Sequence, residues 1–81
     1  MKGTISSKKR REFGLRLQIV MAREDISIAM LAEWMDVGYQ TVKGWRNGCN
    51  FPCIDRFVML CEIFQVSADY LLFGRGEYHR D

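Results

Sequence analysis

Proline, histidine and cysteine are scarce in this sequence, which has one proline, one histidine and three cysteines among 81 residues. Cys49, Cys53 and Cys61 cannot all pair with one another, and no CxxC spacing is present, so we expect reduced thiols. His79 lies far from all three along the chain. We therefore expect neither a metal site nor any other cofactor.

Long apolar runs are also missing. No stretch approaches the roughly 18 residues that a membrane-spanning helix needs, and no continuous apolar segment follows the basic N-terminus. We therefore expect a cytoplasmic protein with no membrane partner. A hydrophobic content of 48% indicates a folded chain rather than a disordered one. At this length about 60 to 65% of the unfolded chain's surface is buried on folding, so one small domain is expected.

The features of an enzyme are absent as well. The sequence has no glycine-rich phosphate loop, and no nucleophile is held beside His79 in a recognisable arrangement. We expect no catalytic residues and no enzymatic activity.

The net charge is only +2, but the charges are unevenly distributed. The first 23 residues contain seven lysines and arginines and one acid, Glu12. Residues 24–42 are acidic, and positive charge returns at Lys43 and Arg46. A basic arm and a basic third helix could together face one polyanion, such as DNA. The alternative is that the basic run 8–11 only solvates the terminus.

Apolar residues recur with helical spacing along the chain, which predicts an all-α fold with no strand. We expect a flexible basic arm at 1–6, one domain at 7–74 and a polar tail at 75–81. The expected helices span about 7–23, 28–35, 39–46, 53–64 and 68–73. Gly14 within the first helix suggests close helix packing, because glycine costs roughly 1 kcal/mol there relative to alanine.

Serine and glycine mark the expected helix boundaries. Ser27 and Ser67 are suited to cap the second and fifth helices, and Gly48 to end the third. Cys53 stands at the start of the fourth helix, where serine would cap better. The expected core residues of the first and fourth helices are Phe13, Leu17, Val20, Met21, Phe57, Leu60, Cys61 and Phe64.

Residues 27–48 are the most informative segment. Their helical period breaks between Val37 and Gly38, which predicts two short helices that meet at a tight turn. The second of them, with about eight residues, is roughly 12 Å long and matches the width of a DNA major groove. The segment therefore predicts a helix-turn-helix whose second helix reads DNA.

Several short motifs, in order and at matching spacing, resemble the lambda-repressor-like, Cro/CI-type helix-turn-helix family. The resemblance covers about residues 12–74. The motifs are Phe13-Gly14, Leu31-Ala32, Val37, Thr41-Val42, Trp45, Asn47-Gly48, Pro52 and the closing VSADYLLFG. The resemblance implies a compact five-helix domain that binds operator DNA, usually as a homodimer, in bacterial or phage transcriptional regulators.

Two departures from the family pattern bear on function. The family commonly begins its second helix with a glutamine that contacts phosphate, whereas Ile28 here offers only its backbone N–H. The family also tends to pair an arginine of the first helix with a glutamate of the third, and Met21 and Arg46 stand at those positions. Arg46 is therefore left for a phosphate or for an acid such as Glu24.

The turn directs the start of the third helix toward the groove, so Tyr39, Gln40, Lys43 and Gly44 are the predicted base contacts. Gln40 is the strongest candidate, because a carboxamide matches the N6 donor and N7 acceptor of adenine. Lys43 suits guanine or a phosphate, or is a solvated surface lysine. Tyr39 suits a thymine methyl group or a phosphate, or covers the edge of the core. Gly44 has no side chain: either it lets the backbone approach the sugar-phosphate closely, or the protein relies on fewer direct contacts and more on DNA shape.

Predicted phosphate contacts surround these positions. Thr41, Asn47 and Asn50 are candidates, although capping or turn chemistry also explains them. The full set of predicted phosphate contacts is Ile28, Thr41, Arg46, Asn47, Asn50, Lys8, Lys9, Arg10 and Arg11.

Two apolar groups are expected to contact proteins. Met30 and Trp34 are neighbours on a flank of the second helix that is usually polar in this family, so they form a predicted partner surface unless the first helix or the arm covers them. Tyr70, Leu72 and Phe73 form a second candidate surface, for dimerisation.

We therefore predict a sequence-specific regulator of transcription that binds double-stranded operator DNA as a homodimer and associates with the nucleoid. The alternative is a protein-interaction module on the same fold, such as an antirepressor or an accessory subunit, with weakened DNA binding.

Overall fold

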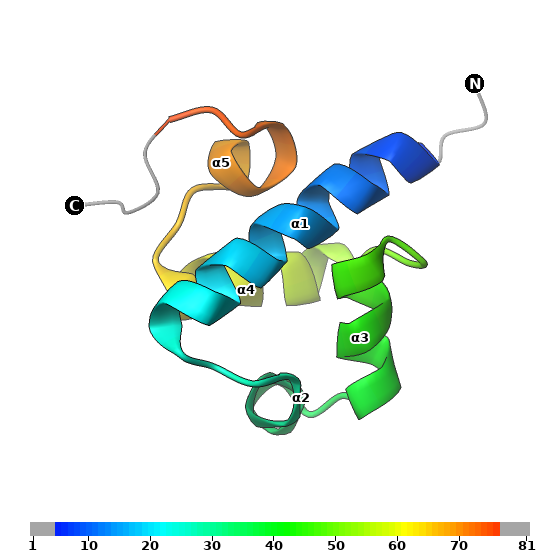
Figure 1. Ribbon diagram of the computed structural model, residues 1–81. Helices are drawn as coiled ribbons and strands as arrows, with labels where there is room; N and C mark the ends of the chain where they lie inside the picture. The colour runs from blue at the N-terminus through cyan, green and yellow to red at the C-terminus, as the bar shows by residue number, and fades with distance from the viewer. Residues whose placement is uncertain (1–4, 77–81) are drawn as a thin grey trace.

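The computed structural model describes residues 5–76, which fold into five α-helices without a strand (Figure 1). The helices are α1 (Ser7–Glu24), α2 (Ile28–Met35), α3 (Tyr39–Asn47), α4 (Ile54–Phe64) and α5 (Ala68–Phe73). The compact all-α fold and the five helices are confirmed, with each end within one residue of its predicted position. Residues 1–4 of the expected arm and 77–81 of the expected tail, including His79, lie outside the described residues.

Serine hydroxyls cap three of the helices. Ser27 accepts a hydrogen bond from the N–H of Met30 at 3.1 Å, and Ser67 from that of Tyr70 at 3.0 Å, as predicted. Ser6, which was assigned to the flexible arm, caps α1 by accepting from the N–H of Lys9 at 3.1 Å. Each bond satisfies a backbone donor that the first turn of a helix leaves unpaired. The cap of α1 thus lies within the expected arm, while the helix itself begins at Ser7, as predicted.

Helix α1 crosses the middle of the molecule, with α3 on one side and α5 on the other (Figure 1). Its buried side chains join those of the other four helices in one core. Cys61 was predicted to be a core residue, and this prediction was wrong. The residue is half-buried and packs against the core rather than within it. The fully or nearly fully buried apolar residues are Phe13, Leu17, Val20, Met21, Leu31, Ala32, Met35, Val42, Trp45, Phe57, Leu60, Phe64, Val66 and Leu71.

The contact between α1 and α3 is unusually close at Gly14. A Cβ atom at this position would lie 2.7 Å from the carbonyl oxygen of Trp45, nearer than real Cβ atoms approach. The expected role of Gly14 in close helix packing is therefore confirmed. Helix α2 also packs on α3, and the connection between them is only Asp36–Gly38.

None of the helices within residues 5–76 has the length and apolar character needed to cross a lipid bilayer.

Candidate nucleic-acid interface

Helix α3 has two contrasting faces. Val42 and Trp45 are buried in the core, whereas Tyr39, Gln40 and Lys43 are exposed. The pattern follows from helical geometry, because residues three and four apart share a face. Burial of Val42 and Trp45 fixes the rotation of α3 about its axis. The exposed side chains are therefore held on one side of a well-anchored helix.

Gly44 is buried, unlike the other three predicted base contacts. A Cβ atom at Gly44 would lie 2.8 Å from Oδ1 and 3.0 Å from Nδ2 of Asn50. The carboxamide of Asn50 thus covers Gly44, so the surface here belongs to Asn50, which is itself exposed. Because Gly44 follows Gln40 by one helical turn, the two carboxamides lie on neighbouring parts of the surface.

Asn50 was predicted to contact phosphate or to serve turn chemistry, and sequence reasoning did not place it beside the exposed face of α3. The glycine at position 44 was the available signal, since a missing side chain in a helix leaves room for another group. That signal does not say which residue fills the space.

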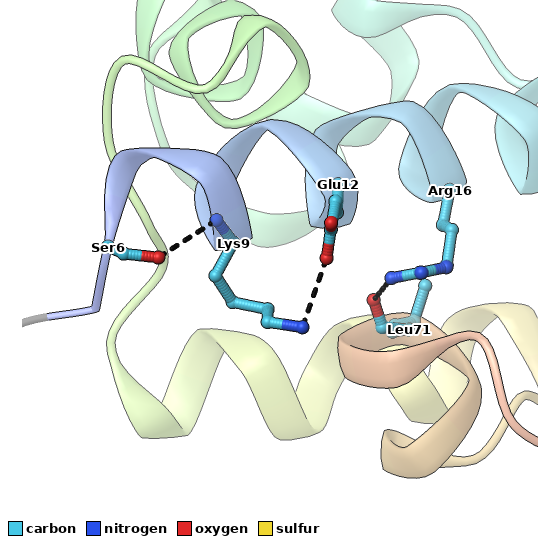
Figure 2. Close-up of polar contacts among 5 residues, drawn as sticks. All are labelled: Ser6, Lys9, Glu12, Arg16 and Leu71. Carbon is cyan, nitrogen blue, oxygen red and sulfur yellow. Dashed lines mark hydrogen bonds and ion pairs between the residues drawn. The ribbon is translucent and has the colours of Figure 1, made fainter.

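The basic run at 8–11 does not form one charged surface. Lys9 Nζ lies 3.0 Å from Glu12 Oε1 and 4.8 Å from the centre of the Phe73 ring. Figure 2 shows Lys9 and Glu12 on the side of α1 that also carries Arg16, whose guanidinium donates to the carbonyl of Leu71 in α5 at 3.2 Å. The hydrogen bond from Lys9 lowers the pKa of the Glu12 carboxyl group.

Arg10 does not join the contacts of Lys9 and Glu12 but bonds to two backbone carbonyl groups. Its Nε donates to the carbonyl oxygen of Gly48 at 3.1 Å, and its Nη1 to that of Ile5 at 2.8 Å. Lys8 and Arg11 are exposed. The reason is geometric: the run is helical, so each residue is rotated about 100° from the previous one. The four cations therefore do not share one side of α1, and Lys9 and Arg10 have partners within the chain. Their assignment as phosphate contacts stays a prediction.

Three other predicted phosphate contacts have different surroundings. Thr41 and Ile28 are half-buried, near the starts of α3 and α2. Asn47 is exposed, and its Oδ1 accepts a hydrogen bond from the N–H of Cys49 at 3.1 Å. The bond shapes the loop after α3, which is the turn role considered for Asn47 as an alternative.

Arg46 and Arg11 come together at a pocket of about 220 Å³ between α1 and the end of α3. The Nε atom of Arg46 is buried and has no hydrogen-bond partner. Gln18 lies beside it, with Nε2 donating to the Arg46 carbonyl oxygen at 2.9 Å. The residues that line the pocket are Arg11, Leu15, Gln18, Arg46 and Asn47.

The two predicted protein-contact surfaces differ. Met30 is 39% exposed and Trp34 51% exposed, so residues 5–76 leave a large part of both open. Phe73 is exposed, but Lys9 lies 4.8 Å and Arg75 5.1 Å from the centre of its ring. Tyr70 and Leu72 are half-buried against the core. The Met30 and Trp34 surface is therefore the more open of the two.

No family model, curated protein or solved structure matches this chain. Within residues 5–76 no group of three or more histidine, cysteine, aspartate or glutamate side chains is arranged to hold a metal ion. Cys49 and Cys53 are exposed free thiols. The strongest candidate site is thus the exposed face of α3 together with Asn50.

Proposed function

We propose that this protein is a sequence-specific, double-stranded DNA-binding regulator of transcription of the bacterial or phage repressor type. In this proposal α2 and α3 form a helix-turn-helix, and α3 enters the major groove. One observation carries it: Tyr39, Gln40 and Lys43 are exposed on α3 while Val42 and Trp45 anchor the opposite face in the core.

The dimensions and chemistry of α3 support this reading. Nine residues give a helix about 14 Å long, and the major groove, about 12 Å wide, admits one helix. Gln40 has the donor and acceptor that adenine requires, and Lys43 can donate to guanine O6 or N7. The carboxamide of Asn50 beside Gly44 adds a second group suited to a base edge or a phosphate.

Backbone contacts would come from residues around this face. We assign phosphate contacts to Thr41, to the backbone N–H of Ile28 and to Lys8. A homodimer that pairs through Tyr70, Leu72 and Phe73 would read two half-sites about one helical turn apart. Such a protein would act in the cytoplasm, on the nucleoid.

A protein-interaction module is the second candidate. Met30 and Trp34 are exposed together on α2, where a partner chain would bury both. An antirepressor or an accessory subunit of this kind would not need the exposed face of α3.

Selection of bound sequences from a pool of random duplexes, at low salt, separates the two candidates. The regulator should enrich one sequence, and Gln40→Ala and Lys43→Ala should each bind it about 5- to 150-fold more weakly, because one good base contact contributes about 1 to 3 kcal/mol of discrimination. Glu62→Gln on α4 is the control and should bind unchanged. A pool that shows no enrichment would exclude sequence-specific DNA binding and leave the interaction module.

A further inference from the structure

We propose that the pocket between α1 and the end of α3 binds a carboxylate side chain of a protein partner, while Leu15 and Ile19 hold an apolar residue of the same partner segment. This site is separate from the exposed face of α3, formed by Tyr39, Gln40 and Lys43, which we propose reads DNA.

The charges in the pocket favour an anion. Arg11 and Arg46 both line it, and no acidic side chain does. Arg46 Nε is buried without a hydrogen-bond partner, which is costly for a polar group removed from water. A guanidinium presents a planar fork of donors that matches a carboxylate, so an entering acid would pair with its charge.

The walls of the pocket are fixed by other contacts. Gln18 Nε2 is held by the carbonyl oxygen of Arg46, and Asn47 Oδ1 by the N–H of Cys49. The volume of about 220 Å³ leaves room for an aspartate or glutamate side chain. The pocket is therefore already formed in the protein alone.

The apolar rim distinguishes a protein partner from DNA. Leu15 is 59% exposed and Ile19 47% exposed, and they are four residues apart on α1, so they are neighbours on its surface. A DNA backbone offers phosphates to the arginines but nothing apolar to this pair. A peptide with an acid beside an apolar residue satisfies both. Helix α5 contacts a different but adjacent side of α1, where Arg16 donates to the carbonyl of Leu71 (Figure 2).

The pocket lies beside the exposed face of α3 and is not part of it. Arg46 follows Lys43 by three residues and Gln40 by six, so it projects about 60° from the first and about 120° from the second. Lys43 is not among the residues that line the pocket, so substitutions at Arg46 and at Lys43 compare a pocket residue with a neighbour outside the pocket at the same change of charge.

The test is selection of random 12-residue peptides on the full 81-residue chain, followed by fluorescence anisotropy with the enriched peptide. We expect enrichment of peptides with aspartate or glutamate beside leucine, isoleucine or phenylalanine. Arg46→Gln and Arg11→Gln should each weaken binding about tenfold, because charged hydrogen bonds are among the stronger ones. Leu15→Ser should also weaken it. Lys43→Gln is the matched control and should bind the peptide unchanged.

Two results would overturn this proposal. One is selection of peptides without an acidic residue, or binding that survives both arginine substitutions in variants whose circular dichroism and unfolding curves show a native fold. The other is a pocket that holds DNA: Arg11→Gln and Arg46→Gln would then each lower the slope of log K against log salt for duplex DNA by about 0.9. Neither result depends on whether Gln40 and Lys43 read bases, so the two proposals fail separately.

Discussion

Gly14 of α1 lies against the backbone of Trp45 near the end of α3, so closely that a Cβ at position 14 would be 2.7 Å from the Trp45 carbonyl oxygen. Two hydrogen bonds also join α1 to the end of α3: Gln18 donates to the carbonyl of Arg46, and Arg10 to that of Gly48. The end of α3 is thus held by three residues of α1. The direction in which α3 presents its exposed face depends on this contact.

Gly14→Ala should destabilise the protein by about 1 to 3 kcal/mol, because the added methyl group meets backbone atoms that cannot move without shifting α3. Urea unfolding measures the effect. Gly44→Ala is the matched control: it also adds a methyl group inside a helix, but that group meets the end of the Asn50 side chain, which can rotate away. Equal losses for the two variants would contradict this account of the contact.

Arg10→Met should cost about 1 to 2 kcal/mol of stability, because its two hydrogen bonds to the carbonyls of Gly48 and Ile5 are lost. Lys8→Met removes the same charge from an exposed position and should have little effect. Thermal unfolding of both variants tests the comparison. A Lys8 variant as unstable as the Arg10 variant would mean that the loss of positive charge, rather than the loss of these hydrogen bonds, lowers the stability.

The helices were predictable because their signals are local. Ser27 and Ser67 each precede an apolar period and cap the helix that follows, and Gly48 follows such a period. The exposure of Gln40 and Lys43 followed from the same periodicity, since Val42 and Trp45 occupy the opposite face.

Contacts between distant parts of the chain were not predictable in this way. The bond from Arg10 to Gly48 spans 38 residues, and that from Gln18 to Arg46 spans 28. Such pairs depend on the crossing of α1 and α3, which no local pattern specifies. For this reason the sequence did not reveal that Arg10 bonds to Gly48, or that Arg11 and Arg46 share a pocket. The ion pair between Lys9 and Glu12 is local, with a spacing of three residues on one helix, and could have been predicted.

Cys53→Ser should stabilise the protein by about 0.5 to 1 kcal/mol. Cys53 is the N-cap residue of α4 and makes no side-chain cap hydrogen bond, whereas serine in the same extended conformation can accept one, as Ser27 and Ser67 do. The control is Cys49→Ser in the preceding loop, which should leave the urea midpoint unchanged. A Cys53 variant no more stable than the parent would contradict the capping argument.

The contact between Lys9 and Glu12 should make stability depend on pH below neutrality. The hydrogen bond from Lys9, together with its charge, lowers the pKa of the Glu12 carboxyl group from its ordinary value of 4.5. The stabilisation is therefore present above pH 4.5 and is lost as the pH falls through the lowered value. The parent and Glu12→Gln should accordingly differ more in urea unfolding at pH 7 than at pH 3. A difference independent of pH would show that the ion pair contributes nothing.

The most direct test of the central claim, that the exposed face of α3 reads base pairs, is the sequence preference of the Gln40→Ala variant. The parent and the variant would each be used to select from the same pool of random duplexes, at one salt concentration. We predict that the variant loses its preference at one adenine position in each half-site and keeps the rest of the site. An unchanged preference at every position, with native unfolding behaviour, would contradict the claim.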